Sequence, residues 1–168
     1  MATISPTYIE EDRCERRNGQ LVPRPMSGDT HSDIQENVRR LLSSQAKALG
    51  MKARSEWSVA RSDTVALDDP DYFTPDVLVA RVPYGKTKAG HLIPPGFLAV
   101  EVVSPKEGGL FDKAQTYSAW GVEHVWIIYP ESRECFEYHG GNSFIKVQDV
   151  LRAGPLSVKL DDVLAEAE

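Results

Sequence analysis

Two spacings of hydrophobic residues divide the chain into helices and strands. Apolar residues that recur every three or four positions predict a long helix over residues 30–49. Its apolar face is formed by Ile34, Val38, Leu41, Leu42 and Leu49. We expect Asp29 or Thr30 to cap its start and Gly50 to end it. A second helix is predicted over residues 109–120, ending at Gly121.

Short apolar runs and turn residues predict the strands. Residues 75–80, 97–103 and 125–129 are runs of the kind that fill buried central strands. Asn18-Gly19 predicts a hairpin over residues 15–22, because both central residues of a type I′ turn need positive φ. Pro23 and Pro25 end its second strand or confine it to a sheet edge. A second hairpin is predicted from residues 133–139 and 143–149, which alternate in polarity around Gly140-Gly141-Asn142.

The remaining segments complete a single domain over residues 1–168. We expect a short helix over 5–12, an extended segment over 51–61 and a short helix from Asp161. The Asp-rich residues 62–74 are a predicted loop, and the Gly- and Pro-rich residues 82–96 are predicted to form a long loop or a ragged hairpin. The order of elements predicts an α/β chain of the α+β type, in which helices flank a central mixed sheet.

Charge and composition narrow the classes of function. The net charge is −6, which argues against a protein that coats polyanions in general. It does not exclude a nuclease, because metal-binding carboxylates make such a site acidic until cations arrive. Arg13, Arg16, Arg17 and Arg24 gather near the start, where they either contact a phosphate backbone or form a solvated surface.

No export or membrane signal is evident. No apolar stretch has the length needed to span a bilayer, and residues 1–12 lack the basic and apolar segments of a signal peptide. Cys14 and Cys135 are far apart in sequence, and we expect both to be free thiols. We therefore expect a cytoplasmic protein.

Two acidic residues interrupt the predicted strands. Asp76 begins one apolar strand and Glu101 lies in the middle of another. An ionised carboxylate in a core strand is costly unless it is paired or binds a metal. If the strands are neighbours, both carboxylates and a backbone carbonyl suit Mg²⁺, which prefers oxygen ligands and keeps bound water. The alternatives are a turn-forming Asp76 after Pro75 and a structural salt bridge at Glu101.

Three further side chains are candidates for the same site. Lys113 and Tyr117 are four residues apart, so they share a helical face that can cover the acidic end of the sheet. Lys113 there can orient a water or stabilise charge on a phosphate; alternatively it is a solvated surface residue and Tyr117 a packing residue. His31 can bond a phosphate or transfer protons, or simply cap the helix.

The sequence lacks the motifs of several other classes of enzyme and binding site. The sequence has no Walker-type phosphate loop, no dinucleotide-binding fingerprint and no cysteine–histidine zinc pattern. Ser104 is not part of a nucleophile elbow, and His91, His124 and His139 lack metal-ligand spacing.

The ordered motifs resemble the Uma-two family of endonucleases, within the PD-(D/E)XK nuclease superfamily. The resemblance covers nearly the whole chain, including Asn18–Leu21, His31 and Leu160. It is carried by Pro75-Asp76, Glu101-Val102-Val103-Ser104-Pro105, Lys113, Tyr117 and Gly121-Val122-Glu123-His124-Val125-Trp126-Ile127. It implies a restriction-endonuclease-like fold.

The resemblance also implies roles for individual residues. Asp76, Glu101 and the carbonyl of Val102 would bind Mg²⁺ or Mn²⁺, and Glu15 would complete the metal shell or a second metal site. The superfamily places a lysine where this chain has Val103, and Lys113 on the next helix would replace it. Gln20 is a second departure, at a position where the family often has an acid.

The expected function is metal-dependent hydrolysis of phosphodiester bonds in nucleic acid, with DNA as the expected substrate. Tyr117 and His31 would assist catalysis. We also expect a homodimer, because many DNA-cutting enzymes need two sites and the second hairpin offers an exposed edge. The rival interpretation is a catalytically inactive module that binds nucleic acid or protein, and a third is another metal-assisted hydrolase on the same scaffold.

Overall fold

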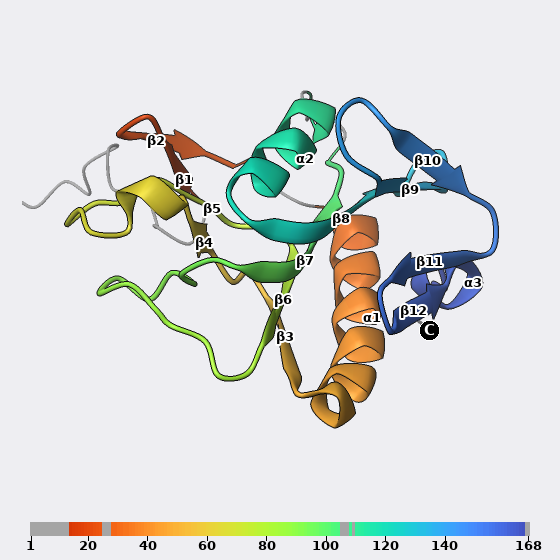
Figure 1. The fold of residues 1–168 in the computed structure, drawn as a ribbon. Coiled ribbons are helices and arrows are strands. Elements are labelled where there is room, and N and C mark those ends of the chain that lie inside the picture. Colours follow the sequence, from red (N-terminus) through yellow and green to blue (C-terminus); the bar gives the residue numbers. More distant parts are fainter. Residues whose placement is uncertain (1–13, 25–27, 105–107, 109, 167–168) are drawn as a thin grey trace, which may run out of the picture.

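A six-stranded mixed sheet forms the centre of the molecule (Figure 1). The structure is a computed structural model that describes residues 14–24, 28–104, 108 and 110–166. The strand order is β10-β9-β8-β7-β6-β3, in which β7 and β8 are parallel and all other neighbours antiparallel. The strands are β3 (Met51–Ser55), β6 (Val77–Arg81), β7 (Gly96–Val102), β8 (Val122–Tyr129), β9 (Glu134–Tyr138) and β10 (Phe144–Val147). The predicted fold class is therefore confirmed.

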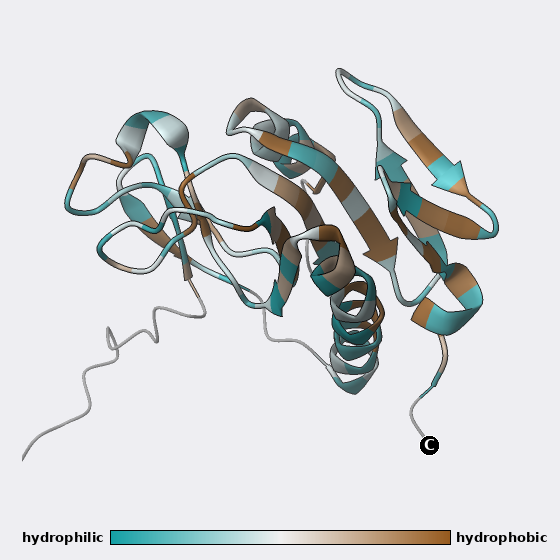
Figure 2. Ribbon diagram, turned by 60° about the horizontal axis from the view of Figure 1, so that its bottom comes forward, coloured by the Kyte–Doolittle hydropathy of each residue, from teal (hydrophilic) through white to brown (hydrophobic). Residues whose placement is uncertain are grey.

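Helices cover the two faces of this sheet. Helix α1 (Asp29–Ala46) contacts β3, β6 and β7, whereas α2 (Leu110–Ala119) contacts β8. Alternate strand residues divide between the two faces: Val77 and Val79 pack in the hydrophobic cluster of α1, whereas Leu78 packs in that of α2. Figure 2 shows hydrophobic positions along the central strands and polar ones on the exposed side of α1.

The long helix agrees with its prediction except at its ends. Gly28 is the N-cap and no side chain caps the start, so the predicted cap at Asp29 or Thr30 is wrong. After Ala46 the chain tightens into a 3-10 turn, Lys47–Leu49, which ends at Gly50 with a left-handed φ of 70°. This tighter turn takes Leu49 off the apolar face, and the residue is 42% exposed rather than buried.

A small second sheet lies beside the first, in the order β2-β1-β5-β4. Its strands are β1 (Cys14–Arg17), β2 (Gln20–Pro23), β4 (Val59–Ala60) and β5 (Tyr72–Phe73). The predicted Asn18-Gly19 turn is confirmed, with φ of 49° and 81°. The Asp71 carboxylate accepts hydrogen bonds from both turn amides, at 3.0 and 2.8 Å. The short strands β4 and β5 were not predicted, because the sequence indicated only an extended segment and a loop.

The chain ends in a hairpin that the sequence analysis missed. Strands β11 (Val150–Ala153) and β12 (Leu156–Lys159) precede α3 (Leu160–Val163), which begins one residue before the predicted Asp161. Both strands are too short to give a clear alternating pattern. The hairpin packs against α1, and the Trp126 indole N–H donates to the carbonyl of Arg152 at 3.0 Å.

Several other predictions concern the surface and the termini. Cys14 and Cys135 are both buried and form no disulfide with each other, as predicted. Strand β10 forms one edge of the six-stranded sheet, while dimerisation through it stays a prediction. None of the helices in the described ranges is long and apolar enough to cross a membrane. The short helix predicted over residues 5–12 lies outside the described residues.

Candidate active site

Strand register places the two candidate acids opposite each other. Val77 on β6 pairs with Val100 on antiparallel β7, so one step further along the register Asp76 faces Glu101. Opposite residues of an antiparallel pair direct their side chains to the same face. That face is covered by α2, since Leu78 and Ala99 pack in the cluster that contains Tyr117. Asp76, one residue before β6 rather than within it, and Glu101 are each only 1% exposed.

Hydrogen bonds and ion pairs fix the Asp76 carboxylate. Its Oδ2 accepts the backbone N–H of Val102 at 2.7 Å, which ties it to the residue after Glu101. Its Oδ1 lies 3.0 Å from Arg24 Nη2 and 3.4 Å from His31 Nε2. The first turn of α1 thus brings the predicted His31 to Asp76.

Helix α2 brings two polar groups to the Glu101 carboxylate. The Tyr117 hydroxyl donates to Glu101 Oε2 at 2.6 Å, and Lys113 Nζ lies 3.2 Å from the same oxygen. Lys113 and Tyr117 lie one helical turn apart and are both buried. A lysine four residues into this helix therefore reaches the acidic end of β7, although the strand carries Val103 where the superfamily has its lysine.

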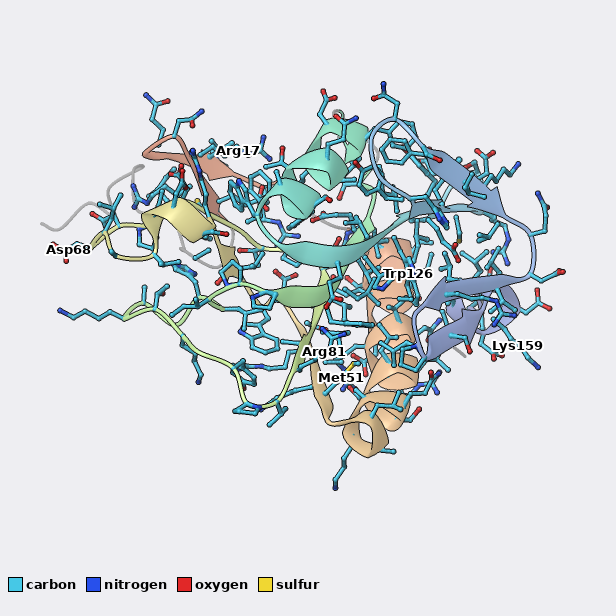
Figure 3. All side chains as sticks on the ribbon, in the orientation of Figure 1. Arg17, Met51, Asp68, Arg81, Trp126 and Lys159 are labelled. Carbon is cyan, nitrogen blue, oxygen red and sulfur yellow. The ribbon has the colours of Figure 1, made fainter. Side chains whose placement is uncertain are left out.

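Glu15 is a second carboxylate partner of Lys113. Lys113 Nζ lies 2.7 Å from Glu15 Oε2, which also accepts the backbone N–H of Thr74 at 2.8 Å. Glu15 Oε1 accepts from Arg17 at 2.9 Å, and Arg17 lies between the β1–β2 hairpin and α2 in Figure 3. Both oxygens of Glu15 are thus occupied by donors, and its strand in the small sheet connects that sheet to the site.

Burial and charge shift the pKa values of these groups in opposite directions. Burial, assisted by Asp76 and Glu15, raises the pKa of Glu101 to about 7 although Lys113 opposes the shift. Burial also acts to raise the pKa of Glu15, but Lys113 and Arg17 outweigh it and hold that pKa below its ordinary value. The pKa of Lys113 is raised, because Glu101 and Glu15 outweigh the effect of burial. Lys113 is therefore a permanent ammonium at neutral pH, suited to stabilising negative charge rather than accepting a proton.

Arg24 is a site residue that the sequence analysis did not single out. Its guanidinium bridges Asp76, at 3.0 Å, and Glu56 Oε2, at 2.6 Å. The sequence placed Arg24 only among the arginines near the start of the chain, because its partners lie 32 and 52 residues away. Only the folded chain brings them together.

The donor set of the site fits a hard divalent cation. Asp76 and Glu101 offer carboxylate oxygens, and the neighbouring Val102 offers a backbone carbonyl; Mg²⁺ is commonly held by one or two carboxylates and keeps several waters. A cage made entirely of protein side chains is not formed: within the described part of the chain, no group of three or more His, Cys, Asp or Glu residues is arranged to hold a metal. Glu15 fits less well, because its oxygens face Lys113, Arg17 and the Thr74 amide.

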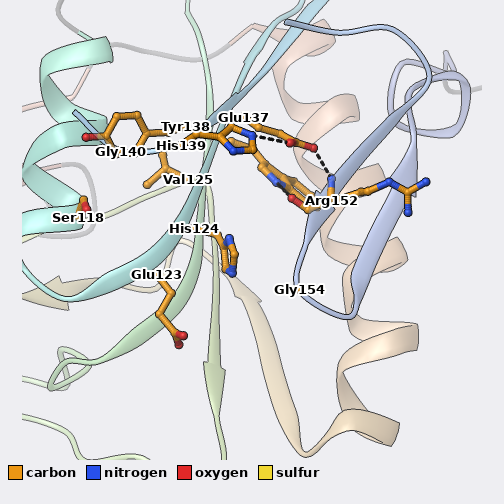
Figure 4. Close-up of a pocket in the computed structure, with 11 residues that line it drawn as sticks. Ser118, Glu123, His124, Val125, Glu137, Tyr138, His139, Gly140, Arg152 and Gly154 are labelled. Atoms are coloured by element: carbon orange, nitrogen blue, oxygen red, sulfur yellow. Dashed lines mark hydrogen bonds and ion pairs between the residues drawn. The ribbon is translucent and has the colours of Figure 1, made fainter. Parts of the chain in front are cut away.

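Two cavities differ in their relation to this site. A cavity of about 370 Å³ adjoins it and is lined by Gly28, Asp29, Thr30, His31, Val103, Pro130 and Glu131. A cavity of about 490 Å³ lies elsewhere, between β8, β9 and the β11–β12 hairpin (Figure 4). There His139 contacts Glu137 at 2.9 Å, and Glu137 accepts the backbone N–H of Arg152 at 2.6 Å. None of the predicted site residues lines this second cavity.

Comparisons with known proteins identify the family and the fold. The model of the Uma2 family, described as "Putative restriction endonuclease", matches residues 7–167. Among solved structures, the chain is similar to "a putative nuclease belonging to DUF820" from Anabaena variabilis ATCC 29413, with a TM-score of 0.74 and 17% sequence identity. The match covers 90% of this chain and 89% of the other, and shows a shared fold. No curated protein sequence matches.

Proposed function

The chain belongs to the Uma2 family, and from that premise we propose that it is an endonuclease that uses Mg²⁺ or Mn²⁺ to hydrolyse phosphodiester bonds in DNA. Family and fold support a nuclease-like function. The observation that carries the finer proposal is the pairing of Asp76 with Glu101 in neighbouring strands, both buried and beside the Lys113 ammonium.

Each residue of the site has a distinct role in this proposal. Asp76, Glu101 and the Val102 carbonyl would hold the cation, which when bound supplies a Lewis acid for the phosphoryl oxygen and lowers the pKa of an attacking water. The Lys113 ammonium stabilises the negative charge that develops on the phosphate. The Tyr117 hydroxyl, 2.6 Å from Glu101 Oε2, fixes the orientation of that carboxylate.

His31 and Glu15 are the remaining two predicted site residues. His31 lies against Asp76 and lines the adjoining 370 Å³ cavity, so it is positioned to contact a phosphate that enters there. The contacts of Glu15 favour the task of holding Lys113 over direct metal binding. Glu15 is thus proposed as a positioning residue.

Nicking of supercoiled plasmid DNA tests the proposal. The wild-type protein should produce nicked circles with Mg²⁺ and none with EDTA, and Asp76→Ala should reduce the rate by at least about 10³-fold, because it removes a metal ligand and the partner of the Val102 amide. Asp68→Ala is the matched control, since Asp68 is an exposed loop residue away from the site (Figure 3). Undiminished nicking by Asp76→Ala would remove the proposed site.

The raised pKa of Glu101 predicts that cation binding depends on pH. Below about pH 7 this carboxyl is mostly protonated in the metal-free protein, so a cation must displace one proton; above that pH it is already ionised. The affinity for Mn²⁺ should therefore fall about tenfold from pH 8 to pH 6. Calorimetric titrations in buffers of different ionisation enthalpy should show release of about one proton at pH 6 and nearly none at pH 8. Equal affinity and no proton release at the two pH values would contradict the prediction.

A further inference from the structure

Arg24 competes for the carboxylate that the proposed function assigns to a cation. Its Nη2 lies 3.0 Å from Asp76 Oδ1, while Nη1 lies 2.6 Å from Glu56 Oε2. The arginine side chain is 15% exposed, whereas Glu56 is 43% exposed. The guanidinium thus contacts the buried Asp76 and the exposed Glu56 at the same time, through two different nitrogens. A planar guanidinium can make such a double contact, whereas an ammonium group cannot.

The charges of the site favour binding of one anion once a divalent cation has bound. Asp76, Glu101 and Glu15 can carry three negative charges, against two positive charges on Arg24 and Lys113. A divalent cation turns this deficit of one positive charge into an excess of one. A single phosphodiester group restores neutrality. At the rim, Arg17 and Glu56 cancel each other and do not change this balance.

We propose that Arg24 is a built-in counter-cation, which occupies Asp76 while the site lacks metal and moves to a nucleic-acid phosphate when a divalent cation takes Asp76. The inference rests on the proposed function, because it assumes that Asp76 binds the cation. In the metal-free protein, the Arg24 guanidinium supplies a positive charge to the buried Asp76 carboxylate, which also contacts the Val102 amide and His31. When metal is bound, repulsion between two cations drives the guanidinium away from Asp76.

The geometry supports a phosphate as the destination. Glu56 keeps its contact with Arg24 Nη1, so the guanidinium stays at the rim of the site when Nη2 leaves Asp76. An arginine fork matches phosphate oxygens as well as it matches a carboxylate. Arg24 therefore links entry of the cation to binding of the substrate backbone.

Calorimetric titration with Mn²⁺ alone tests the competition. Arg24→Gln removes the competing charge and should raise the Mn²⁺ affinity by about tenfold or more. Arg24→Lys keeps one charge but cannot bridge Asp76 and Glu56, so its affinity should lie between those of the other two proteins. Arg39→Gln is the control, because Arg39 pairs with Glu36 on the exposed surface of α1, and this variant should bind Mn²⁺ as the wild type does.

The outcomes separate the two proposals. Tighter binding in the order wild type, Arg24→Lys, Arg24→Gln supports the competition. Equal or weaker Mn²⁺ binding by both Arg24 variants, while the wild type binds, overturns it and leaves the proposed function intact. Failure of the wild type to bind Mn²⁺ overturns both. Far-ultraviolet circular dichroism checks the fold of each variant, and Arg24→Lys decides the question if Arg24→Gln does not fold.

Binding of a short DNA duplex tests the second half of the inference. With Ca²⁺ as the cation and phosphorothioate linkages in the duplex to slow hydrolysis, fluorescence anisotropy gives the affinity at several salt concentrations. Loss of one phosphate contact in Arg24→Gln should weaken binding and lower the slope of log affinity against log salt by about 0.9. An unchanged affinity and slope, or no DNA binding by the wild type, would overturn the phosphate contact.

Discussion

Replacement of Glu101 by glutamine is expected to abolish hydrolysis while leaving the protein at least as stable. Glutamine has the shape of the protonated acid but lacks the anionic oxygen that the cation needs, so the rate should fall by at least about 10³-fold. Burial raises the pKa of Glu101 to about 7, which means that ionising it in the folded protein is costly. Activity and stability should therefore move in opposite directions.

The effect on stability has a definite pH dependence. In the metal-free wild type, the protonated form of Glu101 is favoured in the fold, so its contribution is present at low pH and is lost as the pH rises through about 7. Glu101→Gln does not ionise, so at pH 8 it should unfold with a free energy about 1–2 kcal/mol higher than the wild type, with a smaller gain at pH 6. Urea titrations at both pH values measure this difference. Equal destabilisation at both pH values would show that Glu101 has a structural role instead.

Replacement of Lys113 by methionine should have the largest combined effect. Methionine fills a similar volume but leaves Glu15 and Glu101 buried without the ammonium that lies between them. Removing one partner from such a buried network should lower the free energy of unfolding by about 3–5 kcal/mol. The rate of hydrolysis should fall by about 10²–10³-fold, because charge on the phosphate is no longer stabilised. Lys146→Met is the control, since its exposed pair with Glu134 should contribute less than about 1 kcal/mol.

A double variant separates the structural and catalytic tasks of Lys113. Adding Glu15→Gln to Lys113→Met removes one of the two carboxylates left without their cation, so a substantial part of the lost stability should return. The rate should stay low, because neither change restores a positive charge beside the phosphate. A double variant that regained activity together with stability would show that Lys113 acts only through the fold.

The sequence predicted the central elements because their signals are local. The apolar face of α1, the Asn18-Gly19 turn and the run of β7 are each readable within a few residues. The short strands β4, β5, β11 and β12 were missed, since two to four residues carry too little pattern to differ from a loop. The cap at Gly28 was also missed, because the two residues that follow it, Asp29 and Thr30, have better side chains for capping but lie within the helix.

The candidate site was predictable where a residue violated its local pattern. Glu101 was evident as one acid in an apolar strand, and Asp76 as an acid at the start of another. Arg24 carried no such signal: an arginine between two prolines fits an exposed turn, and its pairing with Asp76 arises from contacts 52 residues apart in sequence. The tasks of Glu15 depend equally on tertiary contacts, with Lys113 and the Thr74 amide.

Anomalous X-ray scattering from crystals soaked in Mn²⁺ tests the central claim most directly. We predict one strong peak at about 2.0–2.3 Å from an Asp76 carboxylate oxygen, a Glu101 carboxylate oxygen and the Val102 carbonyl, with the Arg24 guanidinium displaced from Asp76. The same soak of Glu101→Gln should show no peak there. A wild-type crystal in which Mn²⁺ binds elsewhere, while Asp76 keeps its contacts with Arg24 and the Val102 amide, would contradict the account.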